Sequence, residues 1–148
     1  KKCREECLKC RCVILLKCHQ QKENTMPLIK RFEDIVAWQE ARKLVKRTYQ
    51  ITRNWEFRKD FGLRDQIQRA AVSSMTNIAE GFDCESNVEF ARFLVIARRS
   101  AVEVQSLLYT ALDIEYIDDK VFKDMYDQAA KTKAIIHALK RSLKIQPK

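Results

Sequence analysis

Residues 86–112 read SNVEFARFLVIARRSAVEVQSLLYTAL, and this stretch decides the fold because it describes one long helix. Ser86 followed three residues later by Glu89 forms a capping box, which predicts that the helix starts here. Apolar residues then recur at three- and four-residue spacing, the pattern of a helix face that packs into a core. This core stripe consists of Phe90, Phe93, Leu94, Ala97, Ala101, Val104, Leu108 and Ala111. Such a stripe needs partner helices, so the stretch predicts a helical bundle.

A second apolar stripe on the same helix consists of Val88, Val95, Val102 and Tyr109, spaced seven residues apart. It lies on roughly the reverse side of the helix, where a monomeric bundle presents polar residues to water. We interpret these four residues as a self-association surface. The alternative is that loops or the amino-terminal residues of the same chain cover the stripe.

Three further helices are predicted in residues 26–148. The first runs from Phe32 to about Trp55, and the second runs from Leu63 to about Glu80. Gly81 suits the left-handed backbone position that closes a helix, and Asp118 is a good N-cap for the last helix. Only two glycines and two prolines occur in 148 residues, so the turns that β-hairpins need are nearly absent. The sequence therefore predicts an all-α bundle of four helices.

The first and last predicted helices each carry a basic outer face. On the first helix, the expected core stripe is Trp38, Ala41, Val45, Thr48, Tyr49 and Thr52. Cations are expected to project away from this stripe and from the inner side of the last helix. The candidate nucleic-acid-binding residues are Arg42, Lys43, Lys46, Arg47 and Arg53 on the first helix, and Lys133, Lys140, Arg141 and Lys144 on the last. The alternatives are an ordinary solvated surface and, on the last helix, cations that favour the helix dipole.

The formal charge of +9 would attract nucleic acid, acidic proteins or anionic lipid, and its sign alone does not choose among them. No stretch approaches the roughly 18 to 20 consecutive apolar residues of a membrane-spanning helix. We therefore expect a soluble, cytoplasmic protein without a membrane partner.

The first 25 residues differ from the remainder, because they contain five of the six cysteines. These cysteines are Cys3, Cys7, Cys10, Cys12 and Cys18, and His19 follows the last of them. One interpretation is a thiolate metal site, since Cys7 and Cys10 have the spacing of a zinc hairpin. The other, which we prefer, is a basic tail that is disordered or that precedes a natural start at Met26. No metal site is predicted.

Catalytic groups are sparse in residues 26–148. One histidine, His137, and one cysteine, Cys84, are expected on different elements, whereas a nucleophile needs a base within reach. The two glycines lie 19 residues apart and cannot form a phosphate-binding loop. Two acidic pairs could hold magnesium, but both flank helix starts, where acids favour the dipole: Asp83 with Glu85, and Asp118 with Asp119. We predict a non-enzymatic protein without a cofactor.

Several segments together resemble a known family. They are Phe32 to Gln39, Phe61 to Leu63 with Gln66, the run Asn77, Ile78, Ala79, Glu80 and Gly81, and then Phe90, Arg92, Phe93, Ala97, Ser100 and Glu103. The chain resembles the bacterial four-helix-bundle family that is encoded within intervening sequences of 23S ribosomal RNA. The resemblance implies an up-down bundle that assembles as a ring-like homo-oligomer, with a pentamer expected. We interpret the run from Asn77 to Gly81 as structural.

The same family is similar to the accessory protein of diversity-generating retroelements, which binds nucleic acid and a reverse transcriptase through basic surfaces. Our leading hypothesis is a basic homo-oligomer that binds nucleic acid through its backbone, with structured RNA such as ribosomal RNA favoured over DNA. No aromatic platform for stacked bases is expected. The alternative is a scaffold that binds an acidic protein or a nucleic-acid enzyme such as a reverse transcriptase.

Overall fold

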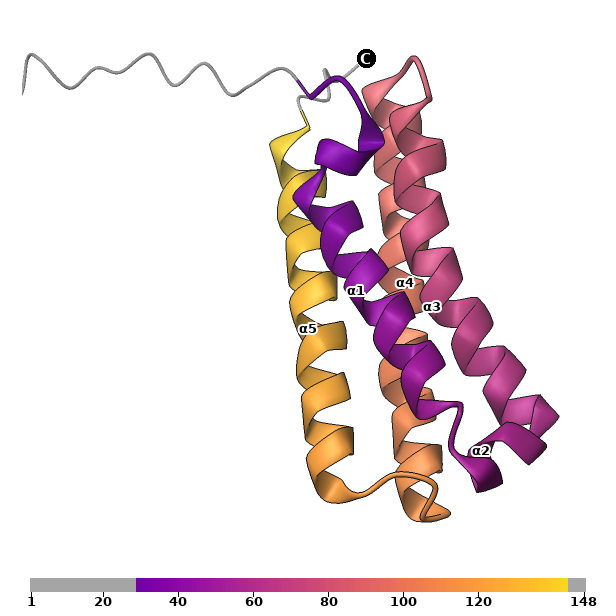
Figure 1. Cartoon of the computed structure of the whole chain (residues 1–148). Coiled ribbons are helices and arrows are strands. Elements are labelled where there is room, and N and C mark those ends of the chain that lie inside the picture. Colours follow the sequence, from indigo (N-terminus) through magenta and orange to yellow (C-terminus); the bar gives the residue numbers. More distant parts are fainter. Residues whose placement is uncertain (1–28, 144–148) are drawn as a thin grey trace, which may run out of the picture.

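A computed structural model describes residues 29–143, which contain helices and no strand. The elements are the 3-10 helix η2 (Phe32–Asp34), α1 (Val36–Ile51), α2 (Trp55–Lys59), α3 (Phe61–Phe82), α4 (Asn87–Asp113) and α5 (Asp119–Ser142). The four long helices alternate in direction, and α1 and α4 lie across the bundle from each other (Figure 1). The predicted all-α, up-down four-helix bundle is confirmed. The predicted tail, residues 1–25, and Lys144 lie outside the described residues.

Side chains cap the three long helices that follow the first. Ser86 Oγ accepts from the Val88 N–H at 3.2 Å, and an Asp118 carboxylate oxygen accepts from the Val121 N–H at 2.7 Å. These two predicted helix starts are confirmed. Asp60, which was not predicted as a cap, starts α3 by accepting from the Leu63 N–H at 2.9 Å. Its position moves the start of α3 two residues ahead of the prediction.

The predicted first helix is divided into three pieces. Ile35 adopts an extended conformation between η2 and α1, and a turn at residues 52–54 separates α1 from α2. The short helix α2 places Phe57 in the interior, where it is fully buried and its ring centroid lies 5.3 Å from that of Tyr116. The prediction of one continuous helix from residue 32 to about residue 55 is therefore wrong, since the helix is interrupted at Ile35 and ends before the turn at residues 52–54.

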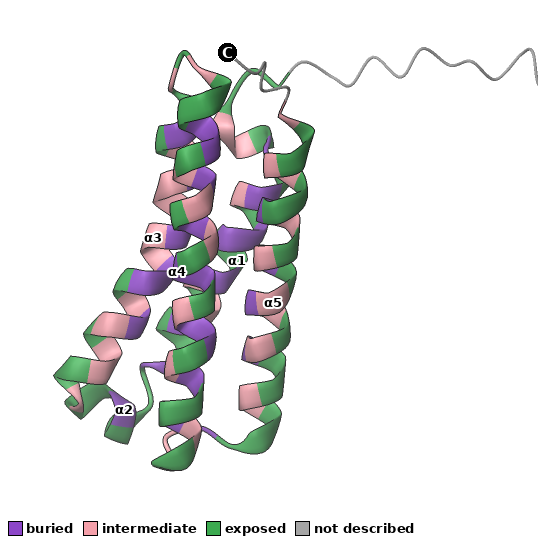
Figure 2. Cartoon of the chain, turned by 180° about the vertical axis from the view of Figure 1, so that it is seen from behind, coloured by how far each residue is buried: buried purple, intermediate pink, exposed green. Residues whose placement is uncertain are grey.

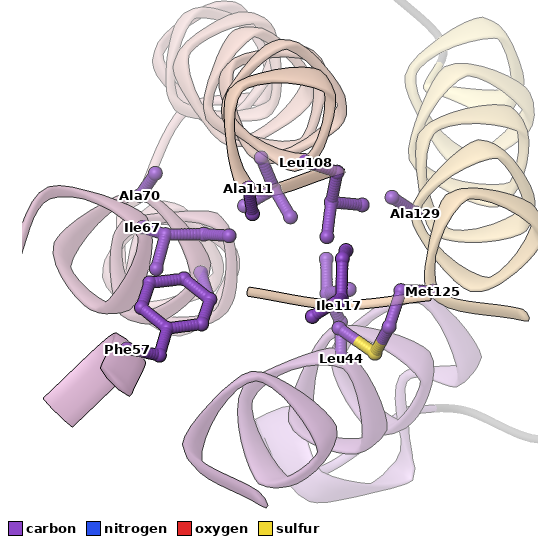
Figure 3. Packing of buried hydrophobic residues seen from close by; sticks show 11 residues of the cluster. Leu44, Phe57, Ile67, Ala70, Leu108, Ala111, Ile117, Met125 and Ala129 are labelled. Carbon is purple, nitrogen blue, oxygen red and sulfur yellow. The ribbon is translucent and has the colours of Figure 1, made fainter. Parts of the chain in front are cut away.

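The core consists of two clusters stacked along the bundle. The cluster near α2 surrounds Leu44, Ile67 and Leu108, and Phe57 fills the space that opens where α3 diverges from α4 (Figures 1 and 3). The cluster at the other end contains Ile78, Leu94 and Ile136 and other apolar residues. Buried positions face inward on every long helix, so the two clusters together hold the four helices in place (Figure 2).

The chain leaves α4 through a left-handed residue, and that residue is Glu115 rather than a glycine. Glu115 has φ 61°, its N–H donates to the Leu112 carbonyl at 2.9 Å, and the Tyr116 N–H donates to the Ala111 carbonyl at 2.9 Å. These are the two hydrogen bonds of a Schellman turn. Gly81 lies inside α3 without a positive φ, so the prediction that it closes a helix in the left-handed conformation is wrong.

Candidate nucleic-acid interface

The boundary between α1 and α5 is built around the buried carboxylate of Glu40. Lys43 Nζ donates to Glu40 Oε1 at 2.8 Å, Gln128 Nε2 donates to Oε2 at 3.0 Å, and Lys131 Nζ lies 3.2 Å from Oε2. The hydrogen bond from Lys43 is the main cause that lowers the pKa of Glu40 to about 2, and Gln128 and Lys131 add to it. Glu40 is therefore ionised at neutral pH, and its single negative charge is shared between Lys43 and Lys131.

A second carboxylate neutralises the next cation along this boundary. Arg47 Nη2 donates to Asp124 on α5, and Arg47 Nη1 donates to Gln128 Oε1 at 3.4 Å. Carboxylates of α1 and α5 thus pair with Lys43 and Arg47. The two helices lie side by side, as a merged basic patch would require (Figure 1), but two of the candidate cations of α1 are paired with carboxylates at this boundary.

Arg42 and Lys46 project to the other side of α1, toward α3. Both are exposed, and neither forms a salt bridge within residues 29–143. They line a groove with a cavity of about 800 Å³ between η2, α1 and α3, which also includes Trp38 and Met75. A neighbouring cavity of about 500 Å³ shares Trp38, Arg42 and Lys46 and adds Lys43. We call these residues, together with Arg31, Phe32, Glu33, Gln39 and Val45, the Trp38 groove.

The other candidate cations lie apart from this groove. Arg53 lines a separate cavity beside the α4–α5 connection, and Lys133 Nζ donates to Gln105 Oε1 of α4 at 3.1 Å. Lys140 and Arg141 occupy the last turn of α5, where their charges favour the helix dipole. The predicted nucleic-acid-binding residues therefore do not form one patch: Arg42, Lys43 and Lys46 lie at one groove, and the others lie elsewhere.

Two aromatic residues of α1 were assigned to the core stripe from sequence, and their surroundings differ from that expectation. Tyr49 is 42% exposed, so its assignment to the core is wrong. Trp38 is half-buried: it packs against the core and lines the Trp38 groove, its ring centroid 5.1 Å from that of Phe32. Fully buried Leu44 occupies the core instead. The spacing of Trp38 and Arg42 could have indicated that both line the same groove, since residues four apart lie on the same helix face.

The second stripe of α4 lies on the surface of the described chain. Val88, Val102 and Tyr109 are 45%, 42% and 50% exposed, and Val95 is half-buried. The Tyr109 ring packs against Phe122 of α5, with 4.9 Å between the two ring centroids, so the apolar face extends from α4 to α5. We call Val88, Val95, Val102, Tyr109, Phe122 and Tyr126 the α4–α5 apolar face, because Tyr126 also packs against Tyr109.

The run from Asn77 to Gly81 lies where α3 packs against α4. Asn77 Nδ2 donates to the Ser73 carbonyl at 2.7 Å, and Ser73 Oγ lies 2.9 Å from Ser100 Oγ of α4. Ile78 is fully buried, and a Cβ on Gly81 would lie only 2.7 Å from the Phe90 ring. Ala79 is half-buried and Glu80 is exposed. The buried members of this run bring the two helices into close contact.

The groups considered for catalysis do not meet. Cys84 follows α3, whereas His137 lies on α5. Burial raises the pKa of the Cys84 thiol, and neighbouring carboxylates, led by Glu89, raise it further. A thiol with a raised pKa is a weak nucleophile at neutral pH. Among residues 29–143, no three histidine, cysteine, aspartate or glutamate side chains are grouped so that they could hold a metal ion.

None of the helices in the described part of the chain combines the length and apolar character needed to cross a bilayer. A comparison with the curated proteins found no match. Among solved structures, the chain is similar to a protein with unknown function from the S23 ribosomal protein family from Bacteroides thetaiotaomicron VPI-5482. The TM-score is 0.66 at 22% sequence identity, over 72% of this chain and 100% of that chain. This likeness confirms the fold.

The family comparison covers most of the bundle. Residues 33–138 match the family described as 23S rRNA-intervening sequence protein, and the match includes η2 from its second residue, all of α1 to α4 and most of α5. The predicted resemblance is therefore confirmed, and the chain belongs to the family of 23S rRNA-intervening sequence proteins.

Proposed function

We propose that this chain is a non-enzymatic, homo-oligomeric protein that binds nucleic acid through backbone electrostatics, with RNA favoured over DNA. The observation that carries the proposal is the pair Arg42 and Lys46, both exposed at the rim of the Trp38 groove. Neither cation has a carboxylate partner among the described residues. Cations that acids do not neutralise can displace the counterions condensed on a phosphate backbone, and this release drives binding.

The family match supports RNA as the ligand. The family description refers to an intervening sequence of 23S ribosomal RNA, which favours RNA over DNA as the partner. A protein that binds ribosomal RNA acts where ribosomes assemble, so we propose a cytoplasmic location.

Self-association is the second part of the proposal. The α4–α5 apolar face exposes two valines and a tyrosine, and such a surface lowers solubility unless another molecule covers it. We propose that a second copy of the chain covers it and that the copies close into a ring, with the pentamer implied by the family resemblance as the expected form. An oligomer would repeat the cations of one groove and raise the overall affinity through multivalency.

The test is a filter-binding salt series with structured RNA and duplex DNA side by side. Arg42→Glu with Lys46→Glu should weaken binding and reduce the salt dependence, by a slope of roughly 0.7 to 0.9 for each lost phosphate contact. The matched control is Lys120→Glu with Lys123→Glu, which changes the charge equally on exposed residues at the start of α5. Its salt slope should remain close to that of the unmodified protein. An affinity that does not change with salt would reject the proposal.

A further inference from the structure

One face of α1 combines aromatic and cationic side chains. Trp38, Arg42, Lys46 and Tyr49 follow one another at steps of four, four and three residues. At about 100° per residue, these four residues lie within roughly 80° of one another. Trp38 is half-buried and the others are exposed, so this face is not part of the core.

This face of α1 borders hollows on the side of α3. Trp38, Val45 and Met75 give the cavity of about 800 Å³ an apolar lining, and Arg42 and Lys46 give it a positive rim. Tyr49 lines a further cavity of about 510 Å³ with Val72, Gln68, Arg69, Ser73 and Thr76 of α3. Trp38 and Tyr49 are eleven residues apart, which corresponds to roughly 16 Å along a helix. The hollows therefore follow α1 over a distance longer than a single base.

The charges around these hollows favour an anionic ligand. The cavity of about 800 Å³ has three cations, Arg31, Arg42 and Lys46, and one carboxylate, Glu33. Glu33 is paired with Arg31 at 2.8 Å, so the charges of Arg42 and Lys46 remain unbalanced. In the Tyr49 cavity the one carboxylate, Asp65, is paired with Arg64 at 2.7 Å.

An aromatic lining with unbalanced cations is the combination by which proteins bind single-stranded nucleic acid, because bases stack on the rings while cations contact phosphates. The Arg42 guanidinium lies over the Trp38 ring, 5.6 Å from its centroid, so a base that takes its place on the indole would leave this cation free to contact the neighbouring phosphate. A duplex keeps its bases stacked on one another and offers only its backbone to such a groove. The chemistry therefore distinguishes single strands from duplexes.

We propose that the hollows along α1 bind a single-stranded segment of nucleic acid, with bases stacked on Trp38 and Tyr49 and phosphates bound by Arg42 and Lys46. This inference rests on the proposed nucleic-acid binding and names the form of the ligand. It also replaces the expectation from sequence that the bundle has no aromatic platform.

The first experiment uses Trp38 as its own probe. The chain has two tryptophans, and Trp55→Phe on α2 leaves Trp38 as the only one. The Trp55→Phe protein is titrated with a twelve-nucleotide oligouridine and, separately, with a blunt RNA duplex. We expect the single strand to quench Trp38 emission in step with binding measured by anisotropy of labelled RNA. The duplex should bind without quenching the emission.

The second experiment removes the rings. Tyr49→Ala changes an exposed residue, and Trp38→Phe keeps a ring next to Phe32, so both proteins should retain the helical circular dichroism signal. Loss of the Tyr49 stack should weaken binding of the single strand about 5- to 150-fold, with unchanged duplex binding, and Trp38→Phe should weaken it less. The matched control is Trp55→Ala, since Trp55 is also exposed beside a cation, with Lys59 Nζ 4.3 Å from its ring centroid.

The outcomes separate this inference from the proposed function. If RNA binds with salt dependence but leaves Trp38 emission and the Tyr49→Ala affinity unchanged, the stacking groove is wrong and the electrostatic proposal stands. Equal losses for single strand and duplex would also overturn the stacking groove. If neither RNA binds at any salt concentration, both proposals fail.

Discussion

Glu115 adopts a left-handed backbone conformation that is costly for a residue with a side chain. Its φ of 61° lets two backbone N–H groups reach the last carbonyls of α4, and the Glu115 side chain itself is exposed. Glu115→Gly should stabilise the fold by roughly 0.5–1 kcal/mol, because relief of the Cβ clash exceeds the extra entropy of glycine in the unfolded chain. Urea denaturation at neutral pH would measure this change.

The control for Glu115→Gly is Asp113→Gly, two residues earlier. Asp113 is the last residue of α4 and is exposed, so glycine there loses helix propensity without relieving a positive φ. We expect it to destabilise the fold by roughly 0.5–1 kcal/mol. Changes of the same sign in both variants would contradict the account of Glu115.

The close packing of α3 on α4 requires a residue without a side chain at position 81, and Gly81 meets this requirement. A Cβ at this position would lie 2.7 Å from Phe90 Cδ2 and 2.7 Å from Phe93 Cβ, and the latter atom is fixed to the backbone of α4. Gly81→Ala should therefore destabilise the fold by about 1–3 kcal/mol, although alanine favours helices. Thermal unfolding followed by circular dichroism would test this prediction.

Gly62 supplies the matched comparison for Gly81. It also lies in α3, and a Cβ there would meet only Asp60 Oδ1 at 3.5 Å, an ordinary contact. Gly62→Ala should leave stability unchanged or raise it by up to about 1 kcal/mol. If both alanine variants were tolerated equally, close packing of α3 on α4 would not explain Gly81.

Local chemistry made some single residues predictable and left others ambiguous. Ser86 and Asp118 were identified because a cap acts within three residues of its own position. Gly81 was misassigned because the same residue type serves a left-handed turn or a close helix contact. The partners that decide between these roles, Phe90 and Phe93, follow in the next helix, and a single sequence does not reveal the contact.

At the scale of elements, periodicity identified the long helices and failed at the ends of α1. The turn after α1 contains no glycine or proline that would have marked it in the sequence. Beyond the turn, Phe57 is buried beside Tyr116, and periodicity does not reveal this contact. Periodicity also failed to separate the core from the groove, because Trp38 and Tyr49 are apolar enough for either. The burial of the Glu40 carboxylate was missed because a charged residue is rarely buried in the interior.

The packing of α1 on α5 depends on the charge of Glu40. Its pKa falls from the usual 4.5 to about 2, so its contribution to stability is complete above about pH 4.5 and is lost as the pH falls through about 2. Glu40→Gln should destabilise the fold by roughly 1–2 kcal/mol at neutral pH, a value reduced by the exposure of both lysine partners. The difference from the unmodified protein should narrow between pH 4.5 and pH 2.

Free energies of unfolding in urea, measured at several pH values in this window, would test the role of Glu40. Glu33→Gln is the control, because Glu33 pairs with Arg31 on the surface outside the α1–α5 boundary. We expect little change in stability for this variant at any pH. A constant difference between the Glu40→Gln protein and the unmodified protein across the window would rule out an ionised Glu40 as the cause.

At the scale of the whole molecule, the two proposed surfaces lie on opposite sides. The Trp38 groove belongs to η2, α1 and α3, whereas the α4–α5 apolar face belongs to α4 and α5, and α4 lies diagonally across the bundle from α1 (Figures 1 and 2). Copies joined through the α4–α5 apolar face would therefore leave their grooves uncovered. Assembly and RNA binding can then occur together, and each can be tested by changes that leave the other surface intact.

Val95→Glu with Val102→Glu places two charges on the α4–α5 apolar face without touching the groove. We expect the unmodified protein to scatter light as a multiple of its 17.5 kDa chain and the double variant to scatter as a monomer. Gln50→Glu on the exposed side of α1 is the control, and it should leave the oligomer intact. A monomeric unmodified protein would contradict the proposed assembly.

The same double variant distinguishes the affinity of a single groove from the additional affinity gained when several grooves bind one RNA. Its monomer should still show quenching of Trp38 by a short single strand, because α1 and α3 are unchanged. Its affinity for a long RNA should fall by about 10²- to 10⁴-fold, since a second groove no longer binds the same molecule. Equal affinity of monomer and oligomer for long RNA would mean that the grooves act independently, and assembly would then need another explanation.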